Sequence, residues 1–443
     1  MRRVALILLA LVVSAQVMWA QAAFNPIEYE EYKLDNGLTV ILHLDRTAPT
    51  AMTYCLYKVG SKDEQPGLTG FAHFFEHLMF EGTENIERGS IDKLITGAGG
   101  VLNASTSFDQ TDYFFKVPIN QLELALWIES ERMMNLVVDS IGIETQRGVV
   151  KEELKQRYEG KPYSTLSDNL FKTTFKGTQY EWTPIGQEQH INNAKYEEFM
   201  AFHDKFYLPN NACLVVAGDL DVDQTKEWIQ KYFGPIESGP NPERIPVVIP
   251  EQTEPREVTI EEETTPLPGV IHSYVTVEST HPDAYALSLL GNIFSSGQSS
   301  RLYRRLVDTD QIALQASSFP FSLEKTGMFA FFAIATQGND IPTLEAAMED
   351  ELKKLQENGV TEEEFTKARN QFEASFARRL SGLSGKARQL AYYSLFEGDT
   401  DLINTELEKY MAVTRDDIKR VANKYLQPNR RNTINYVVVD KAN

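Results

Sequence analysis

Cysteine is scarce in this sequence. Its 443 residues include only two cysteines, Cys55 and Cys213, and each lies in an apolar run that is typical of a β-strand. In an oxidising compartment the two thiols could form one disulfide, and two buried free thiols fit the pattern equally well. The sequence leaves this choice open.

Basic residues are too few to balance the acidic ones. There are 43 Lys and Arg residues against 63 Asp and Glu residues, which gives a net charge of −20. Nucleic acid and anionic membrane surfaces are poor partners for a chain with such a negative field. Cationic peptides would be attracted to it, although an acidic excess is also common on an ordinary solvated surface.

No apolar run is long enough to span a bilayer comfortably. The N-terminal run at residues 4–15 has about twelve residues, whereas a transmembrane helix needs about 20. It follows Arg2 and Arg3 and precedes the small residues at 20–22, which predicts a secretory signal peptide over residues 1–22. No cysteine lies near that cleavage site, so lipid attachment there is not expected. We therefore expect export across the inner membrane, most simply to a bacterial periplasm, without stable membrane insertion.

The length of the chain exceeds what one compact core accommodates. For 443 residues, two domains of roughly 200 residues are expected. Pro and Gly residues cluster among charged residues between Gly234 and Pro255, which indicates a linker. We therefore predict domains at residues 23–234 and 257–443, joined by a linker at residues 235–256.

The second half of the chain repeats a pattern of the first. A helix, a Pro-Asn turn and a strand are predicted over residues 195–217 and again over residues 414–439. Such units are common, so one match is weak evidence. Pairs of strands also open both halves, however, which favours a duplicated α/β domain. The two turns give the offset between the halves, because Tyr207 and Tyr425 occupy matching positions.

The segment GFAHFFEHLMF, which begins at Gly70, has no interior Pro or Gly and predicts a helix. On a helix, His73 and His77 lie one turn apart on the same face. Two imidazoles at that spacing can hold Zn²⁺, whose catalytic sites have three protein ligands and an open position for water. Glu76 lies on that face too and could accept a proton from that water. Two unrelated histidines are the alternative, but H-x-x-E-H arises by chance in only about one chain in a hundred.

The repeat limits where such a metal site can lie. At the offset between Tyr207 and Tyr425, His73 and His77 correspond to Gly291 and Ser295. These two residues fall in a predicted helix that contains no histidine. If the halves share a fold, only the first half can bind metal in this way.

A third ligand is expected from the acidic helix predicted over residues 144–158. Glu152 and Glu153 are adjacent in it, so they point about 100° apart and at most one faces inward well. The residues alone do not decide between them, because glutamates on an acidic helix are usually solvated.

The H-x-x-E-H order resembles that of the inverted zincins, the pitrilysin/insulinase family that includes the mitochondrial processing peptidases. The resemblance covers nearly the whole chain after the signal peptide. It implies an α+β fold of two duplicated α/β domains, each with a mostly antiparallel sheet that has helices packed on one face. In the family, a chain of this size is half of a clamshell that encloses unfolded peptides. The implied activity is that of a zinc-dependent endopeptidase acting on extended or unfolded peptides.

The family pattern also assigns residues that the helical periodicity leaves open. Its third ligand is a glutamate some 76 residues past the second histidine and before a bulky apolar residue, which here is Glu153, followed by Leu154. Its usual outer-shell glutamate, seven residues earlier, is Gln146 in this chain. Gln146 can still accept a hydrogen bond from an imidazole but brings no charge. The resemblance thus implies one Zn²⁺ per chain, held by His73, His77 and Glu153, with Glu76 as the general base.

The strand predicted after Gly99-Gly100 resembles the family's G-G-x-x-N-A-x-T pattern. In the family, an extended substrate peptide pairs with this strand through main-chain hydrogen bonds. The resemblance therefore marks Asn103 and Ala104 as substrate-binding residues. An ordinary strand after a glycine turn is the alternative, and the sequence does not reject it.

One element of the family pattern is missing. Active members carry an Arg and a Tyr seven residues apart that reach across the clamshell to the substrate, and here Val307 and Leu314 stand at these places. Neither can donate a hydrogen bond to an oxyanion. Arg301 and Tyr303 lie nearby but only two residues apart. We therefore expect a heterodimer with a related subunit that supplies the Arg/Tyr pair.

A second hypothesis belongs to a different functional class. The chain could be a peptide-binding or assembly subunit whose metal site is not catalytic. Glu76 argues against this alternative, because a structural metal site needs no base.

Overall fold

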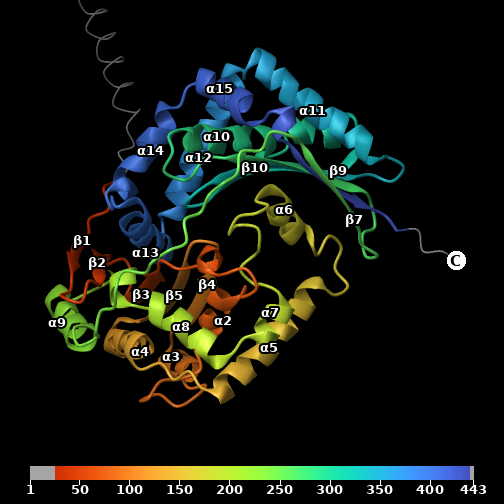
Figure 1. Cartoon of the computed structure of the whole chain (residues 1–443). Helices are drawn as coiled ribbons and strands as arrows, with labels where there is room; N and C mark the ends of the chain where they lie inside the picture. The colour runs from red at the N-terminus through yellow and green to blue at the C-terminus, as the bar shows by residue number, and fades with distance from the viewer. Residues whose placement is uncertain (1–24, 440–443) are drawn as a thin grey trace, which may run out of the picture.

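The computed structural model describes residues 25–439, so the predicted signal peptide lies outside the described residues. Figure 1 shows two β-sheets, one in each half of the chain. The first sheet has the strand order β1-β2-β6-β3-β5-β4, and the second has the order β7-β11-β8-β10-β9. The strands are β1 Glu30–Lys33, β2 Thr39–Leu44, β3 Thr50–Tyr57, β4 Val101–Thr106, β5 Thr111–Pro118, β6 Ala212–Gly218, β7 Arg256–Glu261, β8 Gly269–Thr276, β9 Ala313–Ser322, β10 Gly327–Ala335 and β11 Asn432–Val437.

The two sheets have the same topology once β1 is set aside. Strands β2, β6, β3, β5 and β4 correspond in order to β7, β11, β8, β10 and β9. In each sheet the first of these neighbouring pairs is parallel, and the other pairs are antiparallel. The duplicated, mostly antiparallel α+β fold predicted from the sequence is therefore confirmed.

Helices of each half cover one face of that half's own sheet (Figure 1). Val40 and Leu42 of β2 point into the core beneath α2, α4, α8 and α9, whereas Ile41 points to the other face. The second sheet packs in the same way against α10, α11 and α15. The α-helices of the first half are α2 Phe71–Leu78, α3 Ile91–Gly97, α4 Leu122–Met134, α5 Ser140–Tyr158, α6 Leu166–Thr174, α7 Glu188–Asn193, α8 Tyr196–Phe206 and α9 Val222–Phe233.

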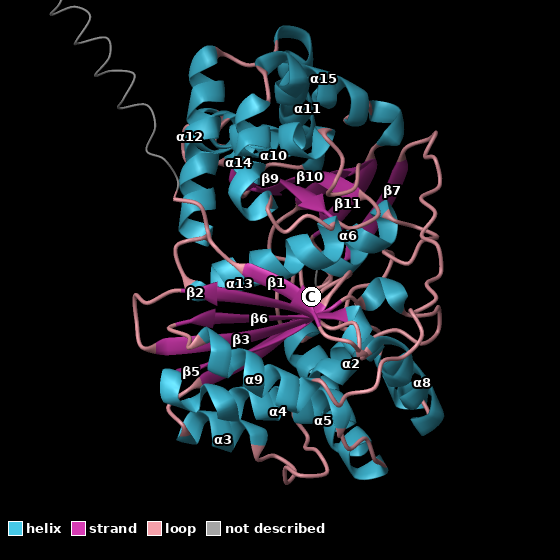
Figure 2. Ribbon diagram, turned by 90° about the vertical axis from the view of Figure 1, so that its left-hand side faces the viewer, coloured by secondary structure: helices cyan, strands magenta, loops and turns pink. Residues whose placement is uncertain are grey.

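The remaining face of each sheet is covered by a helix from the opposite half. Leu390 of α13 packs against Met52 and Val215 of the first sheet, and Figure 2 shows α13 on the side of that sheet away from α4 and α9. Reciprocally, Phe171 of α6 packs against Met328 of the second sheet. The two halves are thereby interlocked. The α-helices of the second half are α10 Asp283–Ser295, α11 Ile341–Asn358, α12 Glu362–Arg379, α13 Leu383–Tyr392, α14 Leu402–Ala412 and α15 Arg415–Tyr425.

The two cysteines lie on opposite faces of the first sheet. Cys55 of β3 packs in the core that contains α2, and Cys213 of β6 packs in the core that contains α13. Both are fully buried free thiols, and burial raises the pKa of each. Because adjacent side chains of a strand alternate between faces, a Cys55–Cys213 disulfide would require a shift in strand register.

Residues 234–255 form neither helix nor strand, and β7 begins at Arg256. Helix α10 ends at Ser295 and contains Gly291, so the positions matched to the two histidines lie on a helix in the second half as well.

No helix within residues 25–439 combines the length and the apolar character needed to cross a bilayer.

A buried ion cluster joins the two halves, and it predicts a pH-dependent contribution to stability. Glu324, between β9 and β10, forms ion pairs with Lys62 at 3.1 Å and Lys58 at 3.2 Å. Burial opposes the charge of Glu324, but the two lysines outweigh it and lower the pKa of this carboxyl from 4.5 to about 2. A depressed pKa stabilises the folded state above about pH 4.5, and this contribution is lost as the pH falls toward 2.

We therefore expect Glu324→Gln to lower the free energy of unfolding by up to about 3 kcal/mol at pH 7. At pH 3 the loss should be less than half as large. Urea unfolding at both pH values, with Glu263→Gln as an exposed control, measures the difference. An equal loss at the two pH values would contradict the ion-pair explanation.

Candidate metal centre

Helix α2 separates an apolar face from a polar one. Phe71, Phe75 and Leu78 are buried, and the Phe71 and Phe75 rings stack on aromatic side chains of α8. His73 and His77 lie on the other face with only part of their side chains exposed, 12% and 23% respectively. Packing of the apolar face therefore fixes the direction in which both imidazoles point.

The beginning of α2 is held by a buried carboxylate that the sequence does not reveal. Glu64 accepts hydrogen bonds from the backbone N–H groups of Gly70 and Ala72, each at 2.9 Å. Gly70 has a φ of +94°, and a Cβ there would lie 2.8 Å from Ile191 Cδ1 and 2.9 Å from the Ile185 carbonyl oxygen. Glycine is thus required where the chain enters the helix.

Helix α5 supplies the carboxylate. Its N-terminus is capped by Asp139, which accepts a hydrogen bond from Gly142 N–H at 2.8 Å. Val150 and Leu154 bury the inner face of the helix, and the side chain of Glu153 projects toward α2. Its neighbour Glu152 is exposed and accepts a hydrogen bond from Gln156 at 3.5 Å. The geometry thus distinguishes the two glutamates, which helical periodicity alone does not do.

The structure brings His73, His77 and Glu153 together. The two Nε2 atoms are 3.3 Å apart, and each lies 3.5 Å from Glu153 Oε2. Zinc bonds of about 2.0–2.1 Å at tetrahedral angles hold ligand atoms roughly 3.3–3.4 Å apart. Two imidazole nitrogens and one carboxylate oxygen at these separations fit a zinc ion with one position left open.

The pKa shifts of His73 and Glu153 also suit a metal. Burial, and then the proximity of His77, lower the pKa of His73 to about 4, so this imidazole is neutral at physiological pH. A hydrogen bond with His77 lowers the pKa of Glu153. Neutral imidazoles and an ionised carboxylate are the forms that bind metal ions.

Glu76 lies beside the three groups but is not one of them. Its Oε2 accepts a hydrogen bond of 2.6 Å from Thr106 Oγ1, which lies on β4. Burial raises the pKa of Glu76.

Strand β4 is the edge of the first sheet, so one side of its backbone is open. It carries Asn103, which is exposed, and Ala104, which is partly buried. Thr106 is the last residue of the G-G-x-x-N-A-x-T pattern, so the sequence places it on this strand. Its hydrogen bond to Glu76 could not be predicted from the sequence.

Gln146 lies on α5 in a network that ties this helix to the end of α2. Its side-chain nitrogen donates a hydrogen bond to Glu81 Oε1. Glu81 also pairs with Arg88 at 2.5 Å, and Arg88 pairs with Asp139 at 2.8 Å. No hydrogen bond between Gln146 and either imidazole is found among residues 25–439, and Gln146 Oε1 is buried without a partner. Gln146 is thus linked to the carboxylate of Glu81 rather than to either imidazole.

This network predicts an effect of Glu81 on metal affinity. Glu81→Ala would leave Gln146 and Arg88 without their shared acceptor and would loosen the contact between α2 and α5. We expect the zinc affinity to fall about tenfold, the lower end of the effect of losing an outer-shell partner. Chelator competition measures it, with Glu84→Ala, an exposed neighbour, as the control. Equal affinity in both variants would show that the network does not position the ligands.

Comparison with protein families gives two matches that together span most of the chain. Residues 39–187, which include all three candidate ligands, match the model described as insulinase, peptidase family M16. Residues 193–372 match the model described as peptidase M16 inactive domain. The name "inactive domain" agrees with the sequence of α10, where Gly291 and Ser295 stand at the positions that correspond to the two histidines of α2.

Individual proteins resemble the chain over nearly its full length. The zinc protease PqqE of Helicobacter pylori is 31% identical over 413 residues, 92% of each chain. An Arabidopsis thaliana protein named "Probable mitochondrial-processing peptidase subunit beta, mitochondrial" is 27% identical, over 89% of this chain and 75% of its own. The crystal structure of a protease from Helicobacter pylori superimposes with a TM-score of 0.87 at 30% identity, covering 93% of this chain and all of the other. The chain therefore belongs to the insulinase family of peptidases, family M16.

Proposed function

We propose that the chain is a zinc-dependent endopeptidase that cleaves extended or unfolded peptides outside the cytoplasm, as the metal-bearing subunit of a heterodimer. The observation that carries the proposal is the tetrahedral spacing of His73, His77 and Glu153, with Glu76 beside them. The names of the relatives support zinc and peptidase chemistry. The signal-peptide pattern at residues 1–22 supports an exported, periplasmic protein.

The side chains around the metal position account for hydrolysis of a peptide bond. When bound, one zinc ion per chain supplies a Lewis acid that activates water and polarises a carbonyl group. Glu76, held by Thr106, accepts the proton of the attacking water and delivers it to the leaving amine. The open edge of β4 at Asn103 and Ala104 pairs with the backbone of an extended peptide.

The missing Arg/Tyr pair supports the proposed partner. Val307 packs against the second core, and Leu314 is 63% exposed without any donor. Arg301 is engaged by Glu364 at 2.7 Å, so it is not available to a substrate. A related subunit that supplies both donors completes the site, and the Arabidopsis relative is itself named as a subunit.

Metal removal tests the peptidase proposal. The purified chain should contain about one zinc per chain, and a chelator should abolish hydrolysis of an unfolded peptide. Zinc should then restore the activity. His77→Ala should lose both metal and activity. A chain that keeps its hydrolytic rate without metal would refute the proposal.

The partner is tested separately. Co-expression with a related subunit that carries the Arg and the Tyr should raise the rate of hydrolysis over that of the chain alone. Substitution of either partner residue should remove the gain. Full activity of the isolated chain, unchanged by any such subunit, would refute the heterodimer and leave the peptidase proposal intact.

A further inference from the structure

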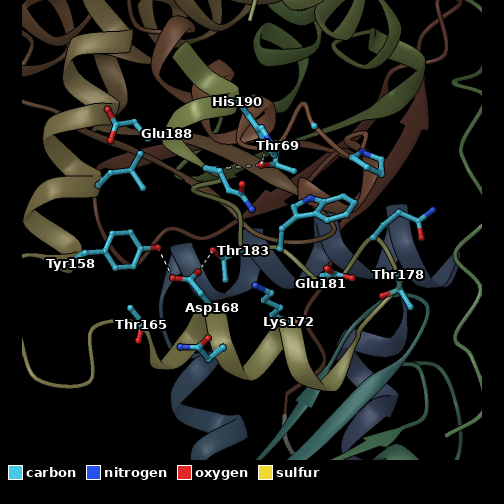
Figure 3. Close-up of a pocket in the computed structure, with 18 of the residues that line it drawn as sticks. Thr69, Tyr158, Thr165, Asp168, Lys172, Thr178, Glu181, Thr183, Glu188 and His190 are labelled. Atoms are coloured by element: carbon cyan, nitrogen blue, oxygen red, sulfur yellow. Dashed lines mark hydrogen bonds between the residues drawn. The ribbon is translucent and has the colours of Figure 1, made fainter. Parts of the chain in front are cut away.

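A cavity of about 1430 Å³ lies between α5, α6, the segment that precedes α7 and the linker. Figure 3 shows Tyr158 and Thr183 on either side of Asp168, and Thr69 beside His190, among the residues that line the cavity. Pockets for small ligands are usually about 300–1,000 Å³. This cavity is larger, which suits a segment of polypeptide better than a small molecule.

The cavity lies on the side of α5 away from the metal centre. Lys151 and Lys155 line it, and each is two residues from Glu153 in the sequence. At 3.6 residues per turn, both point about 160° away from the metal ligand. None of the three candidate ligands is part of the lining, so the cavity is a separate site.

One wall of the cavity is an extended stretch of the linker with unused binding capacity. Val247 and Ile249 pack into the core of the second sheet, whereas Ile245 and Val248 are 50% and 70% exposed and face the cavity. Within residues 245–249, only the Pro246 carbonyl hydrogen-bonds to another described residue, as acceptor from Gln179. An extended backbone with free donors and acceptors is suited to pairing with another extended chain.

The opposite wall leaves positive charges without partners. Most lining carboxylates already accept hydrogen bonds: Asp168, for example, accepts from Tyr158 and Thr183, each at 2.5 Å. Lys155 and Lys172 line the cavity, and neither ammonium group has a hydrogen bond or ion pair within the described part of the chain. Glu159 also lines the cavity and is its one carboxylate without a partner among the described residues. Two unpartnered lysines against one unpartnered carboxylate leave one positive charge that a carboxylate of an occupant could neutralise. Glu152, Glu181 and Glu188 are the other lining carboxylates with partners.

We propose that this cavity is a second polypeptide-binding site. It binds an extended segment by main-chain pairing with residues 245–249, with an apolar side chain against Ile245 and Val248 and a carboxylate between Lys155 and Lys172. The carboxylate comes from an acidic side chain or from a C-terminus. The inference extends the proposed function to a substrate segment held away from the bond that is cut, but binding here does not require hydrolysis.

A single fluorescent label can test the site. The native cysteines are both 0% exposed, so Val248→Cys provides the accessible thiol for an environment-sensitive dye. The full chain also carries Glu76→Gln, so that added peptide is not consumed. We expect a saturable change in fluorescence when an unstructured peptide with an apolar residue beside an aspartate is added. The same dye at Ile141→Cys, 65% exposed at the start of α5 and outside the lining, should not respond.

Versions of the peptide identify the source of the carboxylate. The aspartate is replaced by asparagine, the C-terminus is amidated, or both, and the version that binds more weakly names the group. Lys172→Gln should weaken binding about two- to fivefold, as for loss of an exposed ion pair, whereas Lys176→Gln, outside the lining, should not.

Two results would overturn the inference. One is a label at position 248 that does not respond to any peptide, and the other is an equal response at position 141. Binding that is equally strong without any carboxylate would refute the role of the two lysines. Because no arm depends on cleavage, failure here is distinguishable from failure of the peptidase proposal.

Discussion

Replacing Glu76 by Gln is expected to lower the rate of peptide hydrolysis by about 10²–10⁴-fold, the usual contribution of a general base, without loss of zinc. Glutamine keeps the shape of the side chain and can still accept the 2.6 Å hydrogen bond from Thr106. It cannot take a proton from water. Because Glu76 is not one of the three residues whose side chains surround the metal position, the metal content should not change.

The comparison needs steady-state hydrolysis and metal analysis on the same preparations. Thr106→Val should give a smaller loss, because it frees the Glu76 carboxylate without removing it. Glu84→Gln, an exposed residue outside both proposed sites, should leave both measurements unchanged. If Glu76→Gln left the rate as it was, the chain would fit the alternative of a peptide-binding or assembly subunit with a non-catalytic metal site. Loss of zinc in that variant would instead make Glu76 a ligand.

The fold was predictable from sequence to the extent that it is repeated and local. The Pro-Asn turns after α8 and α15 mark corresponding elements, and the offset between them carries α2 onto α10. The packing of α6 and α13, each against the sheet of the opposite half, was not predictable. Each of these helices is short and buries only a few apolar side chains, and its partner sheet lies far away in the sequence.

In the candidate site, too, the local features were predictable from the sequence and the contacts between distant segments were not. His73, Glu76 and His77 occupy a single helical turn, so their juxtaposition follows from spacing alone. Glu153 needed the family pattern, because the direction of α5 is set by its packing on α2. Glu64 and Glu81 carry no local signal, since their partners are defined only once the chain is folded.

The choice of Glu153 over Glu152 predicts a large difference between two adjacent substitutions. Glu153→Gln removes the only anion among the three donors at the metal position, whereas Glu152 is exposed and bonded to Gln156. We expect Glu153→Gln to lower the zinc affinity by more than about 100-fold, beyond the effect of losing an outer-shell partner.

The two variants are matched in chemistry, helix and charge, so a general effect of net charge on zinc binding cancels between them. Chelator competition on the purified chains measures the affinity, and far-UV circular dichroism shows that α5 is retained. Zinc affinity that fell in Glu152→Gln and survived in Glu153→Gln would mean that α5 is turned by about 100° from its position here. In that case the distances of 3.5 Å from Glu153 to the two imidazoles would not describe the metal-bound protein. Loss of affinity in Glu153→Gln alone would instead identify the third ligand by a measurement that does not depend on catalysis.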